Sequence, residues 1–337
     1  MEEYISDNSL YIRSKNNSMI NRKMIGRVLG MLLFIELGMF LLCAGVSAGY
    51  GESDYKYFLY TCIINAVVGG LLLLYGRGAE NKMSRRDGYC VVTLSWVFFT
   101  FFGMLPFYFS GSIDTITNAF FETMSGFTTT GATILDDIES LSHGMLFWRS
   151  LTQWIGGLGI VFFTIAILPI FTTGGVQLFS AESTGVTHDR THPKINVMAK
   201  WLWTIYLVLT VSETVLLMFG GMSLFDAICQ SFATTATGGY STKQNSISYW
   251  NSPYIEYVVA IFMIVSSINF SLFLMCLKGK VGRLFKDEEL HWFLASVGIL
   301  TFLITLALVF QNHYDWELAF RLSLIHISEP TRRTPIS

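Results

Sequence analysis

Long runs of apolar residues, separated by short polar stretches, fill most of the chain between residues 25 and 311. A bilayer core of roughly 30 Å is crossed by about 20 apolar residues in a helix. The apolar runs therefore predict seven membrane spans, at residues 25–48, 57–76, 89–109, 145–171, 198–220, 254–277 and 290–311. No small-residue cleavage site follows the first run, which favours an anchor over a signal peptide. The pattern predicts an all-α, polytopic membrane protein.

The composition supports this fold class. Hydrophobic residues make up 52% of the 337 residues and charged residues only 14%, whereas soluble domains carry about 25% charged residues. The aromatic content of 15% suits lipid-facing surfaces and their interfacial belts, so membrane lipid is an expected partner. The five cysteines lie scattered in apolar segments, which is typical of small buried side chains and not of disulfides or metal ligands.

Basic residues are concentrated on every second connection between the predicted spans. They precede the first span and follow the second, fourth and sixth, whereas the alternate connections hold few of them. By the positive-inside rule the basic connections and the N-terminus face the cytoplasm, so the connections after the third and fifth spans face outward. The basic residues are Arg13, Lys15, Arg22, Lys23, Arg27, Arg77, Lys82, Arg85, Arg86, Arg190, Lys194, Lys200, Lys278, Lys280, Arg283 and Lys286.

The outward connection after the third span contains the stretch DTITNAFFETMSGF, which is mildly apolar and compatible with a helix. Its 14 residues are too few to cross a bilayer, and Asp114 is a candidate cap for its N-terminus. The Thr- and Gly-rich stretch TTTGATIL follows it. Non-helical backbone at membrane depth must be enclosed by protein or line a water-filled cavity. These features predict a half-helix that enters from outside, followed by a pore-lining segment.

The same arrangement occurs a second time along the chain. Aligning the two stretches by their identical residues pairs Thr128 with Thr235 and Gly131 with Gly238. The second stretch, SLFDAICQSFATTATGGYST, begins with a capping-type residue, Ser223, and continues with a short apolar segment and then Thr and Gly. Internal repeats are common in membrane transport proteins. The repeat favours two span–half-helix–loop–span units over the alternative of two flexible outer loops.

Thr/Gly backbone of this kind suits a filter for cations. Potassium leaves water only where oxygens replace its hydration shell, and consecutive backbone carbonyls supply these oxygens in potassium channels. Glycine permits the dihedral angles that such a strand requires, and the C-terminal ends of the half-helices favour a cation. The predicted filter residues, whose carbonyls would bind potassium as the transported ion, are Thr128, Thr129, Thr130, Gly131, Ala132, Thr133, Thr235, Ala236, Thr237, Gly238 and Gly239.

Ionisable and polar residues at membrane depth are functional candidates. Glu122, on the first half-helix, is a candidate to hold the filter loop or to add negative potential; the alternative is a polar residue near the outer interface. Arg149 and Gln153, at the start of the next span, are candidates to brace the half-helix. Glu213 faces either a partner helix or a cavity, and Glu36 is expected to bond to a neighbouring helix.

Three other features have simpler interpretations. The GGLG motif at residues 156–159 lacks a third glycine and a preceding strand, so close helix packing is favoured over a dinucleotide site. His188 and His192 have metal-site spacing but lie in a charged loop, which favours solvated residues. Asp136 and Asp137 either concentrate cations at the pore mouth or form a solvated acidic loop. No group of residues resembles a catalytic site, so the sequence predicts no enzyme, no cofactor and no nucleic-acid partner.

Three motifs, FFETMSGFTTTGATIL, WRSLTQWIGGLGIV and QSFATTATGGYST, resemble the Trk/Ktr/HKT superfamily of potassium transporters. The likeness extends to about residue 323, and the two leading spans are similar to those of its bacterial Trk-type branch. It implies potassium uptake across a bacterial inner membrane, through a pore surrounded by four span–half-helix–span units. Each unit would contribute a filter strand centred on a glycine, here Gly131 and Gly238. The resemblance also implies a cytoplasmic nucleotide-binding regulatory subunit and suggests a homodimer.

The chain then divides into seven parts. They are a cytoplasmic N-terminus (1–24), two leading spans (25–88), a first pore unit (89–172), a cytoplasmic loop (173–197), a second pore unit (198–280), the start of a third unit (281–323) and a tail (324–337). The tail is polar, contains proline and resembles translated sequencing-adapter sequence. We therefore expect it to be non-native and the chain to be an N-terminal fragment, with a natural short form as the alternative.

Two other functions remain open from the sequence alone. A sodium- or proton-coupled potassium transporter would need a second ion site, for which Glu213 is the sole candidate. A non-conducting membrane anchor would instead dock a cytoplasmic regulator through the basic loops. The sequence also leaves open whether potassium or sodium is preferred.

Overall fold

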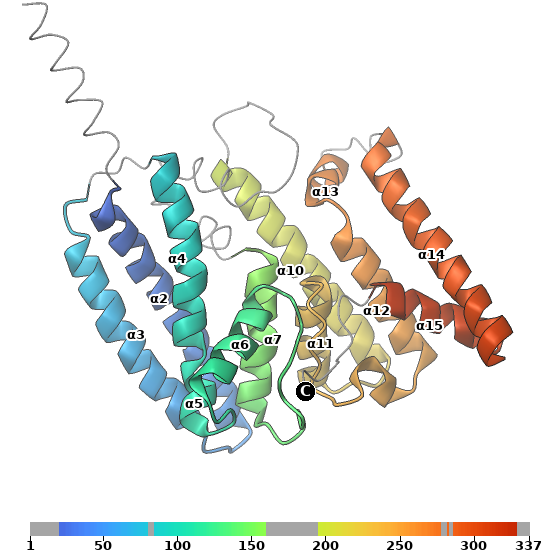
Figure 1. Cartoon of the computed structure of the whole chain (residues 1–337), viewed down its shortest axis with the longest axis horizontal. Helices are drawn as coiled ribbons and strands as arrows, with labels where there is room; N and C mark the ends of the chain where they lie inside the picture. The colour runs from blue at the N-terminus through green and yellow to red at the C-terminus, as the bar shows by residue number, and fades with distance from the viewer. Residues whose placement is uncertain (1–19, 80–83, 160–194, 278–281, 283–285, 329–337) are drawn as a thin grey trace, which may run out of the picture.

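The computed structural model describes residues 20–79, 84–159, 195–277, 282 and 286–328. These residues form helices joined by turns, with no strand among them, as the sequence predicts (Figure 1). The elements are α2 (Arg22–Gly49), α3 (Tyr55–Tyr75), α4 (Arg85–Gly103), α5 (Leu105–Ser110), α6 (Ile116–Phe127), α7 (His143–Gly157), α10 (Ile195–Phe219), α11 (Leu224–Thr235), the 3-10 helix η2 (Ser246–Trp250), α12 (Pro253–Ser267), α13 (Phe270–Leu277), α14 (Glu288–Asn312) and α15 (Trp316–Ser328).

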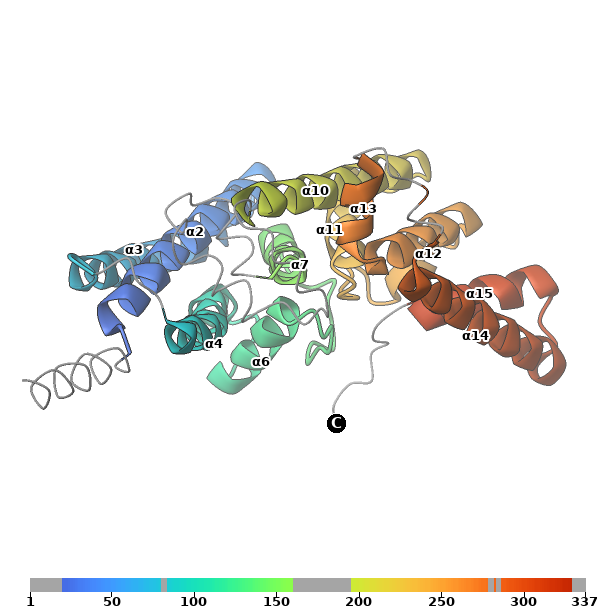
Figure 2. The same cartoon turned by 90° about the horizontal axis from the view of Figure 1, so that it is seen from above.

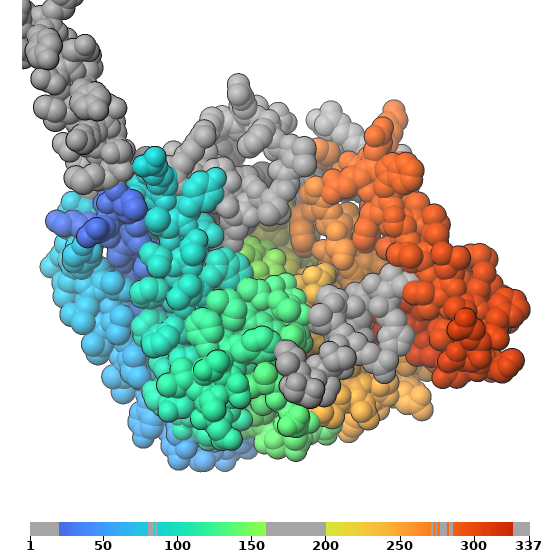
Figure 3. Space-filling model, in the orientation of Figure 1, coloured from blue at the N-terminus to red at the C-terminus, as the bar shows by residue number. Residues whose placement is uncertain are grey.

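Five of the described helical segments are long and apolar enough to cross a membrane. They are Arg22–Gly49, Tyr55–Tyr75, Arg86–Ser110, Lys200–Phe219 and Glu288–Asn312, and each coincides with a predicted span. The space-filling view shows colour passing steadily from blue through green to orange, so segments that are close in the sequence remain close in space (Figure 3).

The two remaining predicted spans differ from the prediction. The span at 145–171 begins as α7, which ends at Gly157, and residues 160–171 lie outside the described residues. An unbroken helix over 254–277 is wrong, because the segment divides into α12 and α13 at Ile268. Ile268 takes an extended conformation with ψ 141°, and the helix resumes after Asn269, whose carbonyl accepts a hydrogen bond from the Leu272 amide.

Several other predictions fall outside the described residues. They include the stretch 1–19, the histidines His188 and His192, most of the loop 173–197, and the last residues of the tail, 329–337. The described part of the tail, residues 324–328, continues helix α15.

The two leading helices, α2 and α3, pack side by side along their lengths (Figure 2). At their crossing Gly30 faces Gly69, and a Cβ added to Gly30 would lie 2.8 Å from the Gly69 carbonyl oxygen. Small residues allow such close approach in membranes. One turn further on, Asn65 donates to the buried Glu36 carboxylate at 3.0 Å, which confirms the expected bond between helices.

The two short helices α6 and α11 are the predicted half-helices. Each has 12 residues, about 18 Å at 1.5 Å per residue, and is too short to cross a bilayer. Ser223 caps α11 as predicted, since its side chain accepts the Asp226 amide. The predicted cap Asp114 is wrong, because the next residue, Thr115, accepts the Asn118 amide and begins α6. Thr115 has the extended backbone of an N-cap, which places its hydroxyl over the open helix end.

The turn between α2 and α3 is tied to the N-terminus of α7. Glu52 accepts hydrogen bonds from the backbone amides of His143 (3.0 Å) and Gly144 (3.4 Å) and lies 2.7 Å from His143 Nδ1. Tyr50 stacks on the His143 ring with centroids 3.9 Å apart. Partial burial opposes ionisation of Glu52, but the bonds from His143 and Gly144 outweigh it, so the pKa of Glu52 is lowered. A carboxylate from the leading pair thus caps α7.

Replacing Gly30 by alanine is expected to destabilise the protein, because the new methyl group would press against the backbone of α3. Overpacking of this kind costs about 1–3 kcal/mol. The measurement is thermal unfolding in detergent. Gly38→Ala is the matched control on α2, because no atom lies within 4 Å of its added Cβ. Equal melting temperatures for the two variants would contradict the close crossing.

Replacing Glu52 by glutamine is expected to lower the melting temperature at pH 7 by an amount that corresponds to about 0.5–1 kcal/mol for a partly exposed carboxylate. A lowered pKa in the folded state stabilises above the unfolded value, about 4.3, and this contribution disappears as pH falls through the folded pKa. The difference between wild type and Glu52→Gln should therefore shrink between pH 5 and pH 3, as followed by unfolding in detergent. A difference that stays constant over this range would argue against the cap.

Candidate functional site

The C-terminal ends of both half-helices meet the last turn of α7, which lies between α6 and α11 (Figure 1). A Cβ on Gly156 would overlap the carbonyl group of Phe127, the last residue of α6. A Cβ on Gly157 would lie 2.8 Å from the Cα of Ala236, immediately after α11. The GGLG motif therefore serves close packing, as the sequence predicts, and brings both half-helix ends to one place.

Each half-helix is followed by a loop of the same unusual conformation. We call residues 128–134 the first Thr/Gly loop and residues 236–242 the second Thr/Gly loop. The first loop has positive φ at Thr129 (53°) and Gly131 (74°), and the second at Thr237 (53°) and Gly239 (79°). Such angles suit glycine but are uncommon for a β-branched residue such as threonine. The surrounding protein must therefore hold both loops in place.

The alignment of the two units differs by one position from the predicted pairing. Helix α6 begins at Ile116 and α11 at Leu224, and both pairs of positive φ angles repeat in the register that these two helix starts define. The sequence comparison maximised identical residues, whereas the backbone conformation pairs Gly131 with Gly239. The predicted match of Gly131 with Gly238 is therefore wrong.

Some carbonyls of the loops are already hydrogen-bonded to the protein. The Gly238 carbonyl accepts from Gln153 Nε2 at 2.7 Å, and the Ala132 carbonyl accepts from Ser125 Oγ at 2.6 Å. In contrast, no donor among the described residues bonds to the carbonyls of Gly131 and Gly239. The predicted set of carbonyl ligands thus separates into bonded and free groups.

Glu122 holds the first Thr/Gly loop from behind. It is 1% exposed, and its carboxylate accepts from Thr133 Oγ1 (2.9 Å) and the Ile134 amide (3.0 Å). Arg149 Nε donates to the same carboxylate at 2.8 Å, in a pair in which both side chains are buried. These contacts agree with the interpretation that Glu122 holds the loop.

Arg149 and Gln153 of α7 also reach the second Thr/Gly loop. Arg149 donates to the Ser241 carbonyl at 3.0 Å, and its guanidinium lies 3.5 Å from the ring centroid of Tyr240. Gln153 accepts the Tyr240 amide at 3.0 Å in addition to its bond with Gly238. A helix of the first unit therefore braces the loop of the second unit.

The sequence interpretation missed Tyr240 and Ser125. The Tyr240 hydroxyl donates to the Glu122 carbonyl at 2.8 Å, so this side chain crosses from the second loop to the first half-helix. A large aromatic residue in a loop of small residues was the available signal. Ser125 gave none, because serine is common at the end of a helix.

Further acidic residues follow the first Thr/Gly loop, before α7. Asp136 and Asp137 are exposed, and Asp137 accepts the amides of Glu139 and Ser140 in a local turn. Gln244 connects the two units there, because it donates to the Asp136 carbonyl at 2.6 Å and accepts the Ile138 amide at 3.1 Å. The two interpretations of Asp136 and Asp137 both remain compatible with this exposure.

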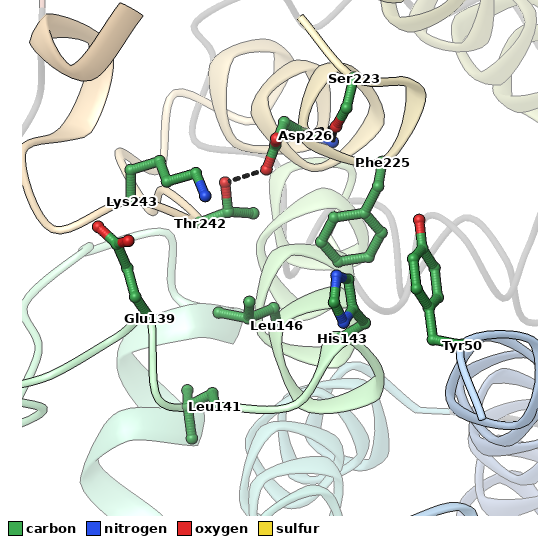
Figure 4. A pocket seen from close by; sticks show the side chains of 10 residues that line it. All are labelled: Tyr50, Glu139, Leu141, His143, Leu146, Ser223, Phe225, Asp226, Thr242 and Lys243. Atoms are coloured by element: carbon green, nitrogen blue, oxygen red, sulfur yellow. Dashed lines mark hydrogen bonds between the residues drawn. The ribbon is translucent and has the colours of Figure 1, made fainter. Parts of the chain in front are cut away.

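A cavity of about 310 Å³ opens beside the second Thr/Gly loop (Figure 4). Both acidic and basic side chains line it, and Thr242 donates to Asp226 across it at 2.6 Å. The lining residues are Tyr50, Glu139, Leu141, His143, Leu146, Ser223, Phe225, Asp226, Thr242 and Lys243.

Comparison with known proteins identifies a protein family that matches this chain. Residues 55–328 match the family model for TrkH, described as a cation transport protein. The Trk system potassium uptake protein TrkH of Salmonella typhimurium is 40% identical over 294 residues, which are 86% of this chain and 61% of that protein. The TrkH of Halomonas elongata is 34% identical over 296 residues. The chain thus spans about 61% of the length of these relatives.

A solved structure is also similar. The crystal structure of the potassium transporter TrkH from Vibrio parahaemolyticus matches with a TM-score of 0.80 and 31% identity, over 93% of this chain and 64% of that one. The matching family consists of transport proteins, which agrees with the prediction that the chain is not an enzyme.

Replacing Arg149 by methionine should destabilise the protein by about 3–5 kcal/mol, because it leaves the Glu122 carboxylate buried without its partner. Adding Glu122→Gln removes the stranded charge, so the double variant should lose less stability than the sum of the two single variants. Unfolding in detergent gives the three values. Additive losses would show that the pair is not coupled.

Proposed function

The chain belongs to the TrkH family of cation transport proteins, and from this premise we propose that it takes part in potassium uptake across a membrane. The two Thr/Gly loops would line a pore and form part of a selectivity filter. The relatives are named as Trk system potassium uptake proteins, which supports potassium as the transported ion.

The paired conformation of the two Thr/Gly loops is the observation that carries this proposal. Both loops follow a half-helix and have the same alternation of positive φ angles, at Thr129 and Gly131 and at Thr237 and Gly239. The Gly131 and Gly239 carbonyls are free of donors among the described residues, so they are available to replace water around a cation. The half-helix ends point their partial negative charge toward the same region.

Glu122, Arg149 and Gln153 would keep the filter in shape. Their buried bonds hold the loops from the side that faces the protein, at Thr133, Ser241 and Gly238. A loop that is fixed from behind presents its free carbonyls at a constant spacing. Potassium would then pass down its electrochemical gradient, to which the membrane potential contributes about 2.3 kcal/mol per charge per 100 mV.

A bacterial inner membrane with a cytoplasmic N-terminus is the localisation we infer. The N-terminal ends of α2, α4 and α10, which carry basic residues, lie at one end of the molecule, and the half-helices lie toward the other (Figure 1). This arrangement supports an outward-facing filter. The basic end is where we propose that a cytoplasmic nucleotide-binding subunit docks, in keeping with relatives named as parts of a Trk system.

Replacing Gly131 by serine is expected to reduce potassium uptake at least about tenfold, because a side chain at this positive φ distorts the loop carbonyls. The measurement is rubidium or potassium uptake in bacteria that lack their own uptake systems. The gene should be recovered by sequencing genomic DNA through and beyond the codon for Arg321, since the chain spans 61% of its relatives.

Gly111→Ser is the matched control, because Gly111 has nearly the same angle (φ 72°) but lies in the turn after α5, with no atom within 4 Å of the added Cβ. Uptake that survives Gly131→Ser at normal membrane levels would contradict a filter role for this loop, whereas abolition would rule against the non-conducting anchor. Flux that stops when sodium and proton gradients are removed would favour the coupled transporter.

A further inference from the structure

Glu213 is a buried carboxyl group that the proposed filter does not use. It lies on α10, is 0% exposed and faces the second half-helix α11. Thr235, the last residue of α11, donates to Glu213 Oε2 at 3.4 Å. The other oxygen, Oε1, has no hydrogen-bond partner among the described residues. Burying an ionisable side chain in a membrane protein costs free energy, so such a residue is a functional candidate.

The surroundings of Glu213 contain hydroxyl groups and no ion pair. Thr210, one turn earlier on α10, has its hydroxyl 3.4 Å from that of Thr235. Trp154 of α7 donates to the Thr210 hydroxyl at 3.0 Å. No ion pair of Glu213 is present in the described part of the chain. The end of α11 is thus joined to α10 and α7 through threonine side chains.

The first and second units hold their half-helices in different ways. In the first unit, Glu122 pairs with Arg149. In the register that pairs Gly131 with Gly239, the position of Glu122 is taken in α11 by Gln230, which carries no charge. The end of α11 is contacted instead from the preceding span, where Glu213 accepts from Thr235.

We propose that Glu213, in its neutral protonated form, is a positioning residue that fixes the C-terminal end of α11 and thereby sets the second Thr/Gly loop. This inference rests on the proposed function. The end of a half-helix carries partial negative charge, so a neutral acid fits there better than a carboxylate without a cation. Thr235 directly precedes the loop, and the next residue, Ala236, packs on Gly157. A shift of Thr235, at the C-terminal end of α11, would therefore move the Gly239 carbonyl.

The test compares Glu213→Gln, a neutral side chain of the same shape, with Glu213→Leu, which cannot bond to Thr235. Both are made in the complete gene, and uptake of potassium and of sodium is measured at matched membrane levels. We expect Glu213→Gln to keep the ratio of potassium to sodium uptake within about twofold of the wild-type ratio. Glu213→Leu should lower this ratio about tenfold, because the spacing of the filter carbonyls is lost. Thr235→Val, which removes the partner hydroxyl, should act like Glu213→Leu.

Thr214→Val is the control at the same helix interface, because Thr214 bonds to Ser231 at 3.0 Å, about one turn before the end of α11. The ratio should be unchanged in this variant, and a similar fall there would overturn a specific role for Glu213. Loss of uptake in Glu213→Gln would also overturn it, since the charge itself would then be needed, as in a coupled transporter. An unchanged uptake ratio in both Glu213→Leu and Thr235→Val would likewise overturn the proposed role of Glu213. Absence of uptake in the wild type would instead refute the proposed function.

Discussion

Non-helical backbone between membrane helices needs hydrogen-bond partners from the protein or from a water-filled cavity, and this constraint governs the centre of the molecule. The two Thr/Gly loops meet it with side chains aimed at their backbone groups. Glu122 accepts the Ile134 amide, Gln153 takes both the Gly238 carbonyl and the Tyr240 amide, and Ser125 covers the Ala132 carbonyl. These partners allow non-helical backbone to lie between the helices. In the proposed function, the carbonyls without such partners would bind the ion.

Helix α7 contacts both units, through Arg149 and Gln153, and is therefore the element on which both units depend. Its N-terminal end is capped by Glu52 from the leading pair of helices, and its C-terminal end carries Gly156 and Gly157 against the two half-helices. Between them, Arg149 connects the carboxylate of the first unit with the loop of the second. The leading pair, which contributes no loop of its own, is thereby linked to the geometry of both loops.

The sequence was sufficient for the half-helices, because a 12-residue apolar stretch with a capping residue and a following Thr/Gly run has few other solutions in a membrane. It could not give the register of the repeat, since identical residues favoured a pairing one position short of the true one. A count of apolar residues also misses the break at Ile268, although the polar residues Ser266, Ser267 and Asn269 flank it. Contacts such as Gln153 with Gly238 join residues 85 positions apart, and no local pattern records them.

The shared use of α7 means that a single substitution on this helix acts on both repeats. A duplicated module usually varies freely once each copy folds alone, but here a change at Arg149 or Gln153 alters the copy that follows as well as its own. The side chains behind the two loops nonetheless differ. A charged pair lies behind the first loop, and hydroxyl contacts lie behind the second. The two units thus share a backbone conformation, while the side chains that support it differ in charge.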